Sequence, residues 1–159
     1  MSRGFTLIEL ASVMVVVSIM AIAAAPVLSR VSETRRDALA GEVERMLSLA
    51  RSRALASGVP AGVRFDTDAQ TLEMLERRGD DAPRAFMEAY RVAERLSGVR
   101  LVGFENEERT DSVWFMPDAT PHARTDAGAW LVAITEPAVV TLERGVTVRV
   151  EPNSGRIVR

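Results

Sequence analysis

An apolar stretch near the amino terminus restricts the fold of this chain more than any other feature. From Phe5 to Ala25 the only ionisable side chain is Glu9. At about 1.5 Å per residue, a helix over this stretch is about 31 Å long, which is enough to cross a bilayer. A carboxylate inside such a helix costs roughly 3 kcal/mol on insertion scales, so it usually has a partner. The stretch holds no arginine or histidine. The candidate partner is therefore a new amino terminus at Phe5, one helical turn from Glu9.

The residues around that junction resemble the class III signal of the type IV pilin-like family. Met1 to Gly4 form a short basic leader, and Phe-Thr-Leu-Ile-Glu with an apolar helix follows, including Pro26 where these helices commonly carry a proline. In that family the prepilin peptidase cuts after the glycine and methylates the new amino terminus. The resemblance implies cleavage between Gly4 and Phe5, N-methylation of Phe5, and a role in subunit assembly for Glu9.

Two other interpretations of the same stretch are an ordinary secretory signal and a plain single-pass anchor. Ala23 to Ala25 could serve as a small-residue cleavage site. Neither alternative explains the cost of Glu9. Arginines after the stretch outnumber Arg3 before it, which by the positive-inside rule favours an external amino terminus. The family resemblance instead implies a cytoplasmic amino terminus, because the peptidase cuts on that side.

The pattern stays helical after the apolar stretch but becomes amphipathic. Apolar residues recur at helical spacing at Leu39, Val43, Met46, Leu47, Ala50 and Ala54. Gly58 and Pro60 favour an end to the helix near Ser57. We therefore expect a continuous helix from Phe5 to about Ala56, bent at Pro26 or lacking a backbone hydrogen bond there. Its apolar stripe must be covered by residues that follow.

Short apolar or alternating runs after residue 58 predict that this cover is β structure. The expected strands are Ala61 to Phe65, Gln70 to Leu75, Phe86 to Val92, Val99 to Phe104, Ser112 to Met116, Trp130 to Thr135, Val139 to Glu143, Val146 to Glu151, and Arg156 to Val158. Hairpin turns are expected at 66–69 and 152–155. The segment from Ala85 to Leu96 is also compatible with a helix. The fold class is α+β, a long helix packed against antiparallel sheets.

The order of these elements resembles the GspH/FimT branch of the pilin-like proteins. Residues 113–118 resemble the aromatic strand and Pro-Asp-Gly of that branch, although Ala119 replaces the glycine. The resemblance implies a cleaved leader at 1–4, a transmembrane helix at 5–29, an amphipathic helix at 30–57 and a β-rich periplasmic domain at 58–159. It implies a single-pass protein of the bacterial inner membrane.

Composition and motifs give no support to an enzyme or a cofactor. The chain has no cysteine, and its net charge of -2 does not favour nucleic acid. His122 is expected in a solvated loop without a nucleophile or orienting group. Asp66 with Asp68 and Asp80 with Asp81 lack the spacing of a calcium loop and are interpreted as turns. Trp114 and Trp130 are expected to be core or interface residues.

Two assembly functions follow from the resemblance. The first is a minor pseudopilin of a type II secretion system, near the tip of a periplasmic pseudopilus that supports protein export, with other minor and major pseudopilins as partners. The second is a minor pilin of a type IV pilus that binds DNA during uptake through Arg156 and Arg159. Glu143 and Glu151 oppose phosphate contacts there, so solvated arginines on a last strand are the simpler interpretation.

Overall fold

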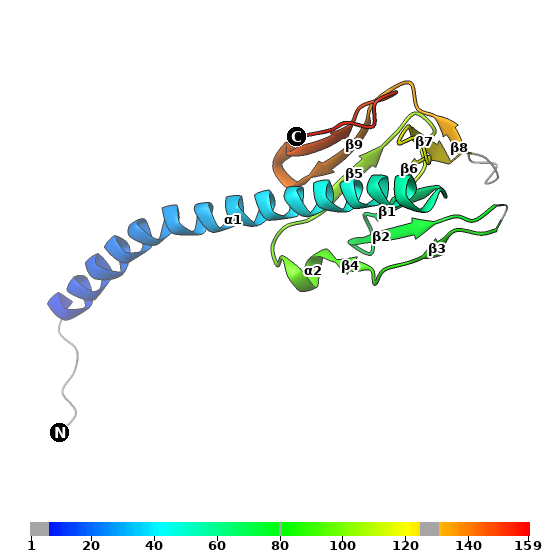
Figure 1. The fold of residues 1–159 in the computed structure, drawn as a ribbon. Helices are drawn as coiled ribbons and strands as arrows, with labels where there is room; N and C mark the ends of the chain where they lie inside the picture. The colour runs from blue at the N-terminus through cyan, green and yellow to red at the C-terminus, as the bar shows by residue number, and fades with distance from the viewer. Residues whose placement is uncertain (1–6, 80, 125–130) are drawn as a thin grey trace. The chain divides into compact units, whose positions relative to one another are not determined.

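The structure is a computed structural model that describes residues 7–79, 81–124 and 131–159, with the backbone alone described over 23–29. A long helix is followed by a series of short strands (Figure 1). The chain divides into two compact units, Met1–Thr34 and Arg35–Arg159. Each unit is described by itself below.

Helix α1 spans Leu7–Ser57, and its 51 residues include Pro26. The predicted continuous helix is confirmed over this range. Its two parts have different side-chain environments. From Leu7 to Ile22 every side chain is exposed, whereas the predicted apolar stripe of the second unit is buried, with Leu39, Val43 and Leu47 at 0% exposure. Only the second part of α1 therefore contributes to a core within its unit.

The end of α1 follows the predicted capping chemistry. Gly58 has a φ of 68°, a left-handed conformation that glycine adopts without steric cost, and its N–H donates to the carbonyl oxygen of Ala54 at 3.1 Å. Pro60 follows and directs the chain into the first strand. The helix therefore ends where the sequence predicts.

The second unit contains two antiparallel sheets. The strands are β1 (Ala61–Asp66), β2 (Thr71–Glu76), β3 (Arg84–Ala85), β4 (Tyr90–Arg91), β5 (Leu101–Glu105), β6 (Ser112–Phe115), β7 (Pro121–Arg124), β8 (Leu131–Ala133), β9 (Ala138–Leu142), β10 (Thr147–Val150) and β11 (Ile157–Val158). The larger sheet has the order β3-β2-β1-β6-β7-β8, and β4 also pairs with β2. The smaller sheet has the order β11-β10-β9-β5. The chain crosses from one sheet to the other before and after β5, and again between β8 and β9.

Both sheets contribute to a single core with the buried stripe of α1. Val63, Met74 and Phe115 come from the larger sheet. Leu142 and Val148 come from the smaller sheet, and all five side chains are completely buried. The expected α+β architecture, a helix packed against antiparallel sheets, is confirmed.

Two predictions of local structure were wrong, one of a strand and one of a loop. The expected strand from Phe86 to Val92 is present only as β4, because the short helix α2 (Val92–Arg95) begins at its end. The expected loop around His122 is instead β7, which pairs with β6 and places His122 opposite Trp114. Pro121 and Ala123 on β7 are buried while His122 and Arg124 are half-buried. That alternation is typical of a strand with one buried face.

Candidate functional site

Glu9 lies in the first turn of α1, on an exposed apolar surface. Its neighbours Leu7, Ile8 and Leu10 are 87%, 75% and 59% exposed. A carboxylate in the first turn is favoured there because it opposes the positive end of the helix dipole. Gly4 and Phe5, the predicted cleavage and methylation residues, lie outside the described residues. The structure therefore places the Glu9 carboxylate, which is predicted to act in assembly, on the helix, while its predicted amine partner lies outside the described residues.

The first unit presents apolar side chains around the whole helix rather than along one stripe. Exposed residues at successive positions, such as Val15, Val16 and Val17 at 59%, 56% and 56%, cannot share one face. A helix that is apolar on all sides is typical of one surrounded by other apolar groups. Within the described part of the chain, no helix is both long enough and apolar enough to cross a membrane.

Arg156 and Arg159, the predicted DNA contacts, lie at the two ends of the last strand and have different surroundings. The guanidinium of Arg159 donates to the carboxylate of Asp37 on α1, forming an ion pair between exposed groups. Arg156 is exposed, and its guanidinium has no side-chain partner among the described residues. The two arginines therefore differ, because the Arg159 guanidinium forms an ion pair and the Arg156 guanidinium does not.

Contacts with distant parts of the chain also fix the turn of the β10–β11 hairpin. The sequence alone did not indicate these contacts. Arg51 of α1 donates from Nη2 to the carbonyl oxygen of Ser154 at 3.1 Å. Gly155 is buried and has a φ of 60°, and a Cβ at this position would lie 2.6 Å from the carbonyl oxygen of Ala119. The hairpin turn thus packs directly on the turn between β6 and β7. From the sequence, Gly155 indicated only a turn, because its close approach to Ala119 joins residues that are far apart in sequence.

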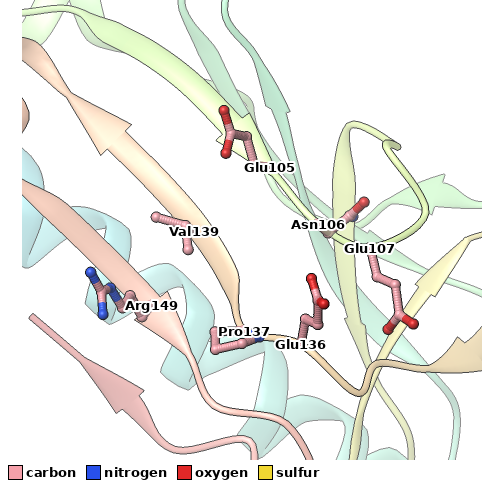
Figure 2. A pocket seen from close by; sticks show the side chains of 7 residues that line it. All are labelled: Glu105, Asn106, Glu107, Glu136, Pro137, Val139 and Arg149. Carbon is pink, nitrogen blue, oxygen red and sulfur yellow. The ribbon is translucent and has the colours of Figure 1, made fainter.

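A groove of about 530 Å³ lies where the chain crosses between the sheets (Figure 2). Its lining residues are Glu105, Asn106, Glu107, Glu136, Pro137, Val139 and Arg149. Glu105, Val139 and Arg149 are neighbours in register on β5, β9 and β10. The groove therefore combines one exposed row of the smaller sheet with two of the crossing segments.

Asn106 and Glu107 fix the backbone of those crossings. Asn106 is 9% exposed and donates from Nδ2 to the carbonyl oxygen of Ser112 at 3.0 Å. The Glu107 carboxylate accepts from the N–H of Thr135 at 2.9 Å and from its hydroxyl at 2.9 Å. These hydrogen bonds, the backbone one foremost, lower the pKa of Glu107 below its ordinary value. Both side chains act as structural ties, and sequence spacing gave no signal for either.

The remaining candidates behave as structural residues. Asp66 accepts at Oδ1 from the N–H groups of Asp68 and Ala69 at 3.0 and 2.7 Å, the hydrogen bonds of the predicted turn. Asp80 and Trp130 lie outside the described residues. Trp114 is 1% exposed, with its indole N–H donating to Ser112 Oγ at 3.2 Å, and it packs over Gly62. No group of three or more metal-ligating side chains occurs in the described ranges.

Comparison with known proteins supplies the interpretation of these features. Residues 1–25 match the family described as the prokaryotic N-terminal methylation motif. The fold resembles a structure of the minor pseudopilin EpsH from the Type 2 Secretion System of Vibrio cholerae, with a TM-score of 0.57 and 17% identity. That likeness covers 78% of this chain and 94% of that chain.

The chain combines a prepilin-type amino terminus with a pilin-like fold. A second structure of Vibrio cholerae EpsH gives a TM-score of 0.56 at 16% identity, covering 79% of this pilin-like chain and 92% of that chain. Such identities establish the fold alone. No curated protein matched the sequence. The predicted resemblance to the pilin-like proteins and the pilin-like fold class are both confirmed.

Proposed function

We propose that this pilin-like chain is a minor pseudopilin of a type II secretion system. It would be a structural subunit near the tip of a periplasmic pseudopilus that supports protein export across the outer membrane. The observation that carries the proposal is the fold likeness, which extends over 94% of a chain named as a minor pseudopilin of such a system. The methylation motif over residues 1–25 supports it independently.

We infer that residues 5–29 form a transmembrane helix in the inner membrane, with the rest of the chain in the periplasm. The supporting observation is the exposure of apolar side chains around α1 from Leu7 to Ile22. The proposed span extends beyond the residues whose side chains the structure describes. An anchor of this kind would keep the subunit in the membrane before it joins a pseudopilus.

Two processing steps belong to the proposal. Prepilin peptidase would cut after Gly4 and methylate Phe5. The new amine would then pair with Glu9 of a neighbouring subunit, which offsets the cost of placing a carboxylate in an apolar environment. Other minor and major pseudopilins would supply such neighbours, giving a hetero-oligomer.

Mass spectrometry of the membrane fraction tests the processing step. Gly4→Val places bulk at the cleavage junction, and we expect this variant to retain its four-residue leader. The control is Ser2→Val, which adds similar bulk to the leader away from the junction and should leave a mature chain beginning at methylated Phe5. A Gly4→Val chain that still begins at methylated Phe5 would remove the cleavage site from the proposal.

The DNA-binding alternative makes a different prediction at Arg156 and Arg159. Phosphate contacts would give binding that weakens steeply as salt rises and that is lost in the double variant Arg156→Ala with Arg159→Ala. Because Arg159 already pairs with Asp37, we expect no such binding by the full chain in a gel-shift assay. Salt-sensitive binding at micromolar protein that those substitutions abolish would favour the uptake pilin over the pseudopilin.

A further inference from the structure

At one end of the unit Arg35–Arg159, the end that contains Arg35, several segments that are distant in sequence lie close together. Figure 1 shows α2, the turn between β9 and β10, and the carboxyl terminus at this end. Arg35 of α1 donates from Nη1 to the carbonyl oxygen of Ser97 at 2.9 Å. The carbonyl oxygen of Arg100 accepts from the N–H of Glu143 at 3.1 Å. These two bonds join the helix, the segment after α2 and the turn after β9.

The exposed charges at this end are mainly positive. We call the group of exposed arginines the basic end, and its members are Arg35, Arg95, Arg100, Arg144 and Arg159. The carboxylates beside them are Asp37, which is paired with Arg159, Glu94 of α2, which is paired with Arg91, and the half-buried Glu143. Within the described residues, the guanidinium groups of Arg95, Arg100 and Arg144 have no hydrogen bond or ion pair. The basic end therefore carries a positive excess although the whole chain has a net charge of -2.

The charge changes sign along the smaller sheet. Strand β5 begins directly after Arg100 and ends at Glu105, which lines the groove with Glu107 and Glu136. Five extended residues cover about 17 Å, which exceeds the Debye length of about 8 Å at physiological salt. The basic end is consequently not neutralised by the carboxylates of the groove.

The position of the basic end in the chain indicates its partner. Arg35 follows the proposed span 5–29 by six residues in sequence, and six residues of chain reach at most about 21 Å. The chain has no lysine, and each guanidinium can form paired hydrogen bonds with a phosphate. Basic groups beside a membrane span are attracted to anionic lipids.

We propose that the basic end docks on the phosphates of anionic phospholipid headgroups beside the membrane anchor. This inference rests on the proposed function, because it requires residues 5–29 to lie in a membrane. Docking would hold the folded unit at the membrane surface in one orientation. Attraction to anionic headgroups would be screened as salt rises.

The test uses the full chain in lipid nanodiscs of phosphatidylcholine, with or without phosphatidylglycerol. Because the chain has no cysteine, Ser97→Cys gives a single site for a nitroxide label at the basic end. The nitroxide broadens the phosphorus resonance of nearby headgroups. We expect several-fold stronger broadening with phosphatidylglycerol than without it at low salt, and loss of the difference at high salt. The same label at exposed Ala82→Cys should give equal signals in both discs.

Matched charge variants test which arginines matter. Arg100→Gln with Arg144→Gln should weaken the phosphatidylglycerol-dependent broadening about tenfold or more. Arg84→Gln with Arg156→Gln removes the same charge elsewhere and should leave it unchanged. Each variant is first compared with the parent chain by thermal unfolding.

The outcomes separate this inference from the proposed function. A chain that does not insert into either disc contradicts both the anchor and the docking. A chain that inserts but broadens the phosphorus signal equally in both discs overturns the docking alone. If that equality is accompanied by immobilisation of the label on adding duplex DNA, the basic end is a nucleic-acid site instead.

Discussion

Among the described residues, Ala119 has the largest positive φ of any residue other than glycine. Its φ is 68°, in the left-handed region that favours glycine. A side chain in the left-handed region costs about 1–2 kcal/mol, although glycine returns some flexibility to the unfolded chain. We expect Ala119→Gly to raise the free energy of unfolding by about 0.5–1 kcal/mol in denaturant titration. Ala123→Gly, at a completely buried position of strand β7, should lower it.

Gly155 should be intolerant of any side chain because two independent effects act there. Its φ of 60° disfavours an L residue, and an added Cβ would lie 2.6 Å from the carbonyl oxygen of Ala119. We expect Gly155→Ala to lower the free energy of unfolding by about 2–4 kcal/mol, the sum of conformational strain and overpacking. Gly145→Ala is the control, because Gly145 has a φ of 78° and no atom within 4 Å of the added Cβ. Equal losses for the two variants would contradict the packing of the two turns.

At the scale of residues, the sequence predicted local features better than long-range ones. The buried stripe of α1 and the cap at Gly58 depend on helical spacing and turn chemistry, which neighbouring residues determine. The sequence also showed that residue 119 is alanine where the resembling segment has glycine. The contacts of Arg51 with Ser154 and of Gly155 with Ala119 were not predictable, because they depend on how distant turns meet.

At the scale of elements, Glu107 connects the two segments that cross between the sheets, because its carboxylate accepts hydrogen bonds from Thr135. Because its pKa is lowered in the folded state, the stabilisation from its carboxylate is present above its ordinary value of 4.5. It is lost as the pH falls through the lowered folded value. We therefore expect wild-type protein to lose more thermal stability between about pH 6 and about pH 3 than Glu107→Gln does.

The control for that pH experiment is Glu105→Gln, at an exposed position in the same groove, whose side chain makes no hydrogen bond or ion pair with the described residues of the crossing segments. Its unfolding temperature should follow the wild-type pH profile. Identical profiles of unfolding temperature against pH for wild type and Glu107→Gln would contradict the prediction, because protonation of Glu107 would then not affect stability.

Individual strands were predictable where alternation was clear and bounded by turns. Strand β7 was missed because Pro121 and a polar surrounding indicated a loop, whereas pairing with β6 supplies its hydrogen bonds. A proline at the first position of a strand is tolerated, which the polar composition obscured. The segment 85–96 contains both strand β4 and helix α2, in agreement with its mixed strand and helix propensities. Tertiary pairing decided both cases.

For the whole molecule, the α+β class and the order of elements followed from the sequence, but the division into two sheets did not. Strand β5 lies between β4 and β6 in sequence yet pairs with β9 in the other sheet. Such pairing depends on which apolar faces cover the stripe of α1. The proposed assembly role likewise rests on residues 1–25, because it would involve other molecules rather than the fold of this chain.

Assembly through Glu9 is the central claim at this scale, and co-purification from solubilised membranes tests it most directly. The processed wild-type chain should co-purify with the pseudopilins proposed as its partners. Glu9→Leu should still insert and still begin at methylated Phe5, but lose roughly tenfold or more of those partners, because the amine then has no carboxylate to pair with. The control Leu10→Val should keep them. Normal partner recovery by Glu9→Leu would contradict the account.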